Sequence, residues 1–312
     1  MGPRAVRITA EDFLIPAEFG ELRLAEHSAG QIGGVHLTLV EQQGRTCFGS
    51  TYQQVPLRVL PPFQFPGELA SLVYLLNPTA GLLDGDGHLV EIDARPGSCA
   101  VVTGQSSTRI HPAVRSFATQ QWRVKAAADS QLVLLPGPNI PFRGCRYHQK
   151  AEIDLDRGAR LIWGDIWTPG RYARVGQEAE FHQFERIVQD LQVRRDGALV
   201  FRDHFTWDGP WDKEKACWYV GNQLAAGSGG LFVTGNIELP PLGPEGPLRR
   251  VVLPLALGDT LIRWCGPVPE LTLDLVRTAL RIAARWCGDP RAVPWLIGSN
   301  HLAPNHWFSS RA

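Results

Sequence analysis

Short apolar runs separated by Gly, Pro, Asp or Asn recur along the first half of the chain. Within them apolar and polar residues alternate or β-branched residues predominate, which predicts β-strands because successive side chains of a strand point to opposite faces. The predicted strands cover residues 35–40, 71–76, 88–94, 99–104, 120–126, 131–136, 150–156 and 159–167. Turn-forming stretches lie at 95–98, 127–130, 155–159 and 194–198. This close spacing leaves no room for helical crossovers, so we expect a mainly β fold built as a large sandwich, barrel or solenoid.

One segment, residues 271–287, has helical spacing instead. Thr272 is positioned to cap its start and Gly288 its end. Its apolar face comprises Leu273, Val276, Leu280, Ala283, Ala284 and Cys287. Arginines at four-residue steps occupy another face and predict a solvent-exposed stripe. These are Arg277, Arg281 and Arg285.

Two stretches rich in Pro and Gly, 58–68 and 237–250, are predicted to be loops or linkers because Pro fixes φ and cannot donate to a sheet. The sequence of 179–193 fits a helix and a strand equally well, and both alternatives stay open. We expect a single domain over residues 1–312, with a C-terminal subregion at 248–300 that contains the predicted helix. No internal repeat is visible, so periodicity alone does not indicate a solenoid.

Composition excludes several classes of protein. With 44% hydrophobic and 20% charged residues, the chain can bury a sizeable core and lacks the signature of disorder. Lys plus Arg equals Asp plus Glu at 31 each, so no net charge draws the protein to nucleic acid or anionic lipid. The first residues lack the apolar stretch of a signal peptide, and no run is long enough to span a membrane, so we expect a cytoplasmic protein. The six cysteines show no CxxC spacing and are expected to be buried, reduced thiols.

The most distinctive segment is NPTAGLLDGDGHL, residues 77–89. Its glycines allow positive φ and close backbone approach, while Asp84 and Asp86 present carboxylates, so the segment is predicted to be a tight loop between strands. An EF-hand calcium loop would need a Glu at its twelfth position, which is absent here. A dinucleotide-binding turn would need a following helix, whereas a strand is predicted there.

The run LLNPTAGLLDGD, residues 75–86, resembles the hydrophobic-His-Pro-Pro-Gly-Gly-Leu-Val-Gly-Gly-Asp signature of the UreD/UreH family of urease accessory proteins. The matching residues are Pro78, Gly81, Leu82, Gly85 and Asp86. Further segments resemble the family in the right order: TGQSSTRIHP (103–112), LVLLPGPNIPFRG (132–144), LIWGDIWTPGR (161–171) and RRDGALVFRD (194–203). The resemblance covers residues 70–205, with weaker agreement in the final helix and at 292–297.

The resemblance implies a β-helical fold and a non-enzymatic scaffold that delivers nickel to apo-urease. It implies binding to UreF, through UreF to the GTPase UreG, and to the apo-urease subunits, with no tightly bound cofactor and Ni²⁺ only in transit through an interior polar passage. The positions carried over to that passage are Asp86, Ser107 and Asp165, and we add Asp84, His111 and Arg171 as neighbouring candidates. Carboxylates with retained water suit transit because a conduit must release the ion. The alternative that Asp86 and Asp165 only hold turn backbones stays open.

Two departures from the family pattern affect this passage. The family's Lys-Phe-Tyr-Arg stretch corresponds to Thr108 through His111, and its late acidic residue falls at Arg202, with Asp203 one position further on. If the passage exists, Asp86→Ala or Asp165→Ala should lower urease activation while leaving the fold intact.

Two other classes of function compete with this one. A Ser/His/Asp hydrolase could draw on Ser107, His111 or His204, and Asp165, but no GxSxG elbow exists, and a GxxxxGK[ST] nucleotide loop is also missing. An interaction module unrelated to urease could use the aromatic segment 206–222 as its contact patch, with a packed aromatic corner as the alternative for the same residues. The tryptophans of that segment are Trp207, Trp211 and Trp218.

Overall fold

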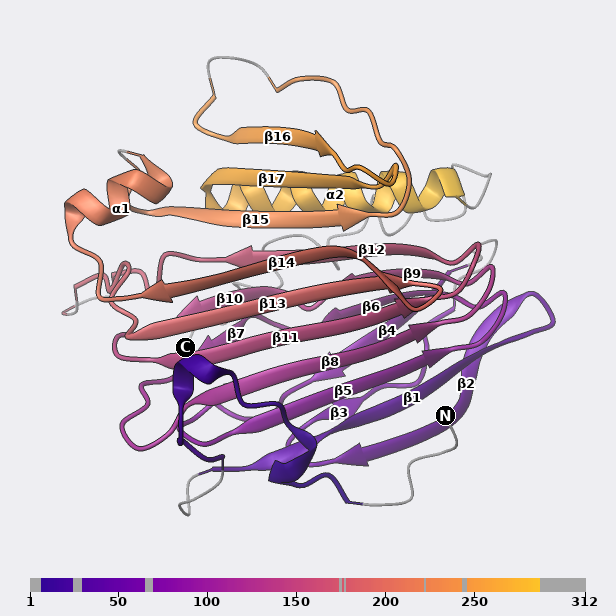
Figure 1. Ribbon diagram of the computed structural model, residues 1–312, viewed down its shortest axis with the longest axis horizontal. Coiled ribbons are helices and arrows are strands. Elements are labelled where there is room, and N and C mark those ends of the chain that lie inside the picture. Colours follow the sequence, from indigo (N-terminus) through magenta and orange to yellow (C-terminus); the bar gives the residue numbers. More distant parts are fainter. Residues whose placement is uncertain are drawn as a thin grey trace.

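The chain forms two stacked β-sheets and two α-helices in a computed structural model (Figure 1). The structure describes residues 7–24, 30–64, 70–173, 176, 178–221, 223–242 and 246–286. The fold is mainly β, as predicted. The helices are α1 (Lys213–Val220) and α2 (Val268–Trp286). The strands are β1 (Ile32–Gln42), β2 (Arg45–Gln54), β3 (Arg58–Val59), β4 (Ser71–Leu76), β5 (Gly87–Ala94), β6 (Cys99–Gly104), β7 (Thr108–Ile110), β8 (Ala118–Ala126), β9 (Gln131–Leu135), β10 (Pro138–Pro141), β11 (Arg146–Leu155), β12 (Arg160–Trp167), β13 (Arg186–Arg195), β14 (Ala198–Asp208), β15 (Ala226–Val233), β16 (Arg249–Pro254) and β17 (Thr260–Pro267).

Successive strands in the middle of the chain alternate between the two sheets. The first sheet has the order β14-β13-β11-β8-β5-β1-β2, and the second follows β16-β17-β15-β12-β9-β6-β4-β3. The central neighbours β5, β8, β11 and β13 are parallel, as are β4, β6, β9 and β12. The chain therefore winds as a coil that adds one strand to each sheet per turn, which is the β-helical arrangement that the resemblance implies.

Every predicted strand is present, and the ambiguous segment resolves as a strand. Residues 186–195 form β13, and the residues just before it have no regular structure. The Pro-rich stretches are loops for most of their described length, with β3 at the start of one and β16 at the end of the other. The thiol prediction needs correction, because among the described cysteines Cys145 is buried while Cys47, Cys99, Cys217 and Cys265 are only partly buried.

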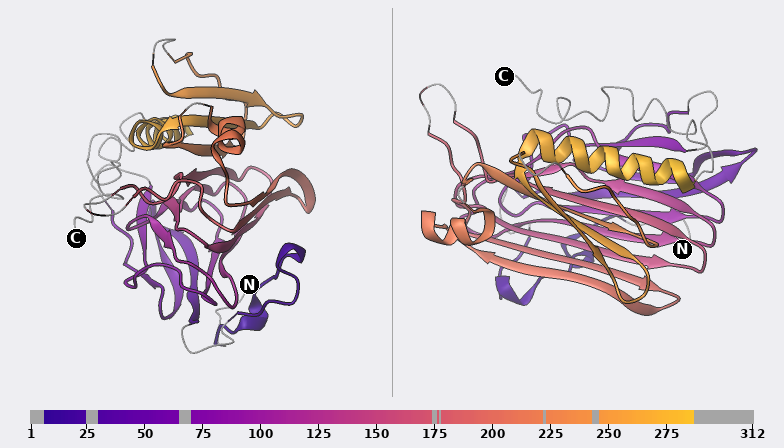
Figure 2. Two further views of the ribbon diagram at one scale, coloured as in Figure 1. Left: turned by 90° about the vertical axis from the view of Figure 1, so that its left-hand side faces the viewer. Right: turned by 90° about the horizontal axis from the view of Figure 1, so that it is seen from above.

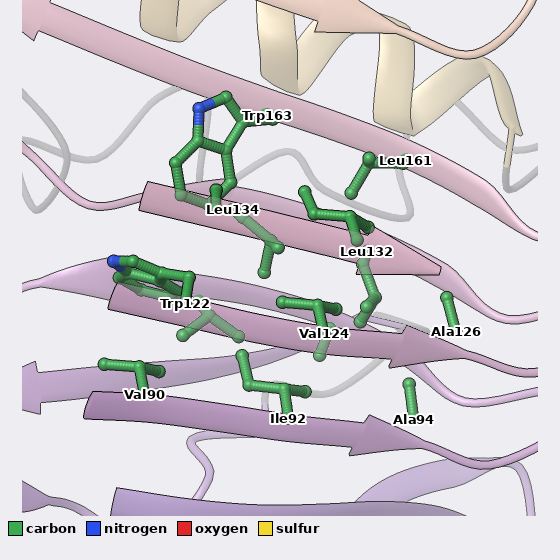
Figure 3. Packing of buried hydrophobic residues seen from close by; sticks show 14 of the residues in the cluster. Val90, Ile92, Ala94, Trp122, Val124, Ala126, Leu132, Leu134, Leu161 and Trp163 are labelled. Atoms are coloured by element: carbon green, nitrogen blue, oxygen red, sulfur yellow. The ribbon is translucent and has the colours of Figure 1, made fainter. Parts of the chain in front are cut away.

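Apolar side chains fill the space between the sheets (Figure 3). In the first sheet the inward row Val90, Trp122, Ala151 and Leu191 lies in register across four strands. From the second sheet Trp163 packs edge-to-face on Trp122, with ring centroids 5.4 Å apart. Burying each large side chain of this kind stabilises the fold by roughly 1.5–3 kcal/mol.

Helix α2 covers the outer face of the second sheet (Figure 2). Gly164 and Gly229 leave room for its Leu275, whose side chain lies within 3.4 Å of where a Cβ would sit on either glycine. The helix starts at Val268, earlier than predicted, so the capping role of Thr272 is wrong. Its hydroxyl instead donates to the carbonyl of Val268 at 2.6 Å, inside the helix.

The three arginines of α2 are exposed, as predicted, whereas Leu273 is only half-buried. Cys287 and Gly288 lie outside the described residues. None of the helices in the described ranges is long and apolar enough to cross a membrane.

The N-terminal segment lies against the outer face of the first sheet (Figure 1). Ile8, Phe13 and Phe19 pack there with Phe117, whose ring stacks on Phe19 at 4.5 Å. The amide of Leu14 donates to Gln121 Oε1 at 3.1 Å. The outer face is thus covered at this place, and the interior site described next lies on the opposite face of the same strands.

Candidate functional site

A row of polar side chains crosses the otherwise apolar interior between the sheets. His88, Gln120, Gln149 and Gln189 occupy matching positions on β5, β8, β11 and β13. We call these four residues the polar row. None is more than 9% exposed. Because neighbouring strands are roughly 4.8 Å apart, the row follows the axis of the coil.

Apolar clusters lie on both sides of this row. The inward positions two residues towards the strands' C-terminal ends carry Val90, Trp122 and Ala151. The positions two residues the other way carry Ala118, Tyr147 and Ile187, which belong to a second cluster. Burying polar side chains between two hydrophobic clusters costs free energy unless the polar groups are hydrogen-bonded. The row is therefore a feature that core packing alone does not explain.

Asp165 joins the polar row from the opposite sheet. The alternation of β12 turns Trp163, Asp165 and Trp167 inward, while Gly164 faces α2. The carboxylate of Asp165 accepts hydrogen bonds from Trp163 Nε1 at 2.6 Å, from Gln149 Nε2 at 2.7 Å and from Gln189 Nε2 at 3.3 Å.

The two glutamine amides are held in this orientation by other side chains. Asn139 Nδ2 donates to Gln149 Oε1 at 3.0 Å, and Trp167 Nε1 donates to Gln189 Oε1 at 2.8 Å. Each glutamine therefore keeps its amide nitrogen directed at the Asp165 carboxylate. A network whose members are all satisfied is rigid and specific in geometry.

Burial raises the pKa of Asp165 to about 6, and the hydrogen bonds from Trp163 and Gln149 oppose this increase. The carboxyl is thus mostly ionised at neutral pH. Within the described ranges it forms no ion pair, although Arg263 acts on it from a distance. A buried carboxylate without a paired cation is a position where a passing cation would be stabilised.

One end of the row leads to an ion pair between β14 and β17. Gly230 of β15 pairs with Asp165 on one side and with Arg263 of β17 on the other, so Asp165 and Arg263 lie in one cross-strand row. Arg263 donates to Asp203, and their side chains are 34% and 18% exposed. This end therefore reaches the surface.

The family pattern aligns its late acidic residue with Arg202, and the sequence offered Asp203 one position later without assigning it to the passage. Arg202 lies on the other face of β14 and pairs with Asp190, whose Oδ1 is 2.9 Å from Arg202 Nε. The inward-facing Phe201 and Phe205 were the available signal, because residue 203 shares their face.

The other end of the row opens into a pocket of about 50 Å³. His88, Gln120 and Trp122 form its buried part, and exposed residues such as Thr79 and Ser106 form its rim. We call this the inner pocket. Ser107, a predicted passage residue, lies in its wall together with Arg109.

The loop aspartates bind backbone amides. Asp86, which is 3% exposed, accepts from the amides of Gln31 at 2.7 Å and Leu83 at 2.8 Å. The carboxylate of Asp84 accepts from the amides of residues 114–116 at 2.9–3.0 Å. These bonds favour the turn-holding alternative for Asp86 and give Asp84 a similar role in holding backbone amides. Their role as nickel ligands stays a prediction.

His111 and Arg171 lie near this loop and its neighbour β10. The Nε2 atom of His111 is 3.1 Å from the carbonyl oxygen of Ala80, and its ring meets Phe142 edge-on. Arg171 lies over the same Phe142 ring at 4.9 Å and pairs with Glu180. The hydrolase alternative gains no support, because the hydrogen bonds to Asp165 come from amides and an indole, not from an imidazole.

The tryptophans of the aromatic segment have two different environments. Trp211 is 5% exposed and stacks on Tyr219 at 4.3 Å, and Trp207 stacks on Phe205 at 4.2 Å. These two form the packed corner that was the alternative for the segment. Trp218, on α1, is 84% exposed and is the one of the three that a partner could reach without rearrangement.

Trp218→Ser is expected to change the free energy of unfolding by less than about 0.5 kcal/mol, because an exposed indole loses few contacts on removal. Urea titration of the variant and the unchanged protein measures this. A loss well above that value would mean that the indole is packed in solution.

One protein family and several known proteins are similar to this chain over the part that carries these residues. The family model described as UreD urease accessory protein matches residues 31–242. The chain is 34% identical to Urease accessory protein UreD 2 of Synechococcus sp. (strain JA-3-3Ab) over 216 residues, which cover 66% of this chain and 76% of that protein. It is 33% identical to Urease accessory protein UreD of Synechococcus sp. (strain JA-2-3B'a(2-13)) over 257 residues, or 77% and 91% of the two chains.

A more distant relative extends the comparison. Urease accessory protein UreD 2 of Brucella suis biovar 1 (strain 1330) is 28% identical over 247 residues, which cover 78% of each chain. The residues matched by the family model include the polar row, Asp165 and the loop at 77–89. The chain therefore belongs to the UreD family of urease accessory proteins.

Proposed function

We propose that this protein assists urease maturation as a non-catalytic cytoplasmic scaffold that also conducts Ni²⁺ through its interior. In this proposal it binds UreF, through UreF the GTPase UreG, and the apo-urease subunits. The ion travels along the polar row between the inner pocket and the Asp203–Arg263 end. Membership of the UreD family supports the maturation role. The partners and the ion path are the proposed part.

The observation that carries the conduit is the buried carboxylate of Asp165, which lies in the middle of the row and has no ion-pair partner among the described residues. Ni²⁺ accepts carboxylate and imidazole as ligands, and this path presents the carboxylate of Asp165 and the imidazole of His88. Within the described ranges no group of three or more His, Cys, Asp or Glu could hold a metal ion. A path built from single ligands separated by amides binds weakly at each step, which suits release at the far end.

Asp165→Asn tests the conduit. The amide keeps the size of the side chain and removes the charge, so the ion loses its main attraction to the centre of the row. In an activation assay with purified apo-urease, partner proteins and Ni²⁺, we expect the initial rate of activation to fall at least about tenfold, since about 1.4 kcal/mol of lost stabilisation suffices for that factor.

Asp154→Asn is the matched control. It makes the same chemical change on β11, at an exposed position on the outer face of the first sheet. Its activation rate should equal that of the unchanged protein. A normal rate for Asp165→Asn would reject the conduit and leave the scaffold.

A further inference from the structure

The loop between β7 and β8, residues 111–117, exposes an apolar side chain at its tip. Val114 is 80% exposed, whereas Ala113 before it and Ser116 after it are buried. A single exposed apolar residue is common on protein surfaces and indicates nothing by itself. What distinguishes Val114 is how firmly the rest of the structure holds the backbone beneath it.

Groups outside the loop hold the backbone of this tip. The Asp84 carboxylate accepts hydrogen bonds from the amides of residues 114–116 at 3.0, 2.9 and 2.9 Å. The carbonyl of Val114 accepts from Arg146 Nη1 at 3.4 Å, and the amide before it, that of Ala113, donates to the carbonyl of Gly144 at 3.1 Å. Hydrogen bonds to a charged acceptor are among the stronger ones in proteins, so these bonds order the tip in one backbone conformation.

The ordered tip contributes little to the protein's own core. The side chain of Val114 points into solvent, whereas ordering the loop costs conformational entropy. A segment that is ordered before it binds loses less entropy on docking, and a β-branched side chain has few rotamers to lose. An ordered loop with valine at its tip is therefore suited to insertion into a pocket of another protein.

Positive charge surrounds the tip. Three exposed arginines adjoin it along the chain or through its hydrogen bonds, namely Arg23, Arg115 and Arg143. Within the described ranges none of the three has a carboxylate as an ion-pair partner, whereas Arg146 is paired with Glu185 at 2.8 Å. Uncompensated positive charge favours a negatively charged partner surface. The tip therefore fits an apolar pocket whose rim carries carboxylates.

We propose that residues 111–117 form a docking tip, with Val114 seated in an apolar pocket of a partner protein and the arginines around it facing carboxylates on the rim of that pocket. The inference rests on the proposed function, because it takes the partner to be a protein of urease maturation. Asp84 is a positioning residue for this tip, since it sets the backbone conformation. An anionic membrane also attracts arginines, but one valine buries too little apolar surface to anchor a protein in lipid.

Surface plasmon resonance of the purified protein with apo-urease and with UreF, measured separately, tests the tip. Val114→Ser removes the apolar group and should raise Kd about tenfold for one of the two partners, with an unchanged urea midpoint because the side chain is exposed. Arg115→Gln should slow association with the same partner, and NaCl at about 500 mM should abolish that difference by screening. Leu199→Ser is the matched control, because Leu199 is 52% exposed at the start of β14, on the opposite end of the first sheet (Figure 1), and its Kd should not change.

Asp84→Asn separates positioning from contact. The amide nitrogen of asparagine cannot accept a hydrogen bond, so at least one of the three loop amides loses its acceptor. Hydrogen exchange at residues 114–116 should become faster and Kd should rise, whereas Val114→Ser should weaken binding without changing the exchange. Faster exchange in Asp84→Asn with an unchanged Kd would reject the positioning role.

The outcomes separate this inference from the proposed function. If Val114→Ser binds both partners as the unchanged protein does, the tip is rejected and the scaffold stands. If the unchanged protein binds neither partner, the scaffold is rejected and the tip with it. Binding of the unchanged protein, but not of Val114→Ser, to phosphatidylserine vesicles would also overturn the tip, because Val114 would then contact lipid. A normal activation rate for Asp165→Asn rejects the conduit and leaves the tip unaffected.

Discussion

Asp86→Ala is expected to lower the free energy of unfolding by about 3 kcal/mol. The carboxylate is 3% exposed and accepts the backbone amides of Gln31 and Leu83. A hydrogen bond to a charged group contributes roughly 1.5–3 kcal/mol, and a donor left unpaired in the interior adds its own cost. The substitution therefore disturbs two chain segments at once, the start of β1 and the loop before β5. Urea titration measures the change.

Asp86→Asn is the graded control for this prediction. Its side-chain oxygen can still accept from one of the two amides, so its loss should be smaller than that of the alanine variant. Equal stability of Asp86→Ala and the unchanged protein would contradict the structural role. In that case the expectation from the sequence, that this substitution spares the fold, would stand.

Asp165→Asn is expected to remove a pH-dependent loss of stability of about 3 kcal/mol. Burial raises the pKa of this carboxyl from 3.8 to about 6. As pH rises from about 4, the unfolded chain gives up the proton first, so the folded state is progressively disfavoured until about pH 6 and the effect is then constant. A pKa difference of one between the folded and unfolded chains corresponds to about 1.4 kcal/mol.

Urea titrations of both proteins at pH 4 and pH 7 measure this effect. Asparagine cannot ionise, so the stability of the variant relative to the unchanged protein should increase by about 2–3 kcal/mol from the lower to the higher pH. Asp154→Asn, at an exposed position, should show no such increase. Parallel behaviour of Asp165→Asn and the unchanged protein would mean that the carboxyl titrates as it does in the unfolded chain.

Replacing the two aspartates of the predicted passage is thus expected to have different effects. Asp86 supports a loop, and its removal is expected to reduce activation indirectly through stability. Asp165 carries a cost when it is ionised, and its replacement by Asn is expected to reduce activation while the variant gains stability relative to the unchanged protein between pH 4 and pH 7. A protein that keeps a costly buried charge at this place supports a functional reason for the charge.

The sequence predicted most of the β architecture because alternation is a local property. The pattern of ARLIWGDIW identified a strand, and its period of two already placed Trp163, Asp165 and Trp167 on one face. The loop at 77–89 was also predicted from the sequence, because Gly and Asp favour turns wherever they occur. The start of α2 was missed because Val268 joins the helix directly from β17, without a capping residue.

Local patterns were sufficient for the mainly β class, the strand positions and the family resemblance. Only the tertiary structure shows that the polar row is aligned, with Gln120, Gln149 and Gln189 beside His88. The alignment depends on the register between strands about 30 to 40 residues apart in the sequence. The same holds for Asp203, which lies on the inward face of β14 in place of Arg202. Such pairings follow from how the coil stacks its turns, and no local pattern encodes that stacking.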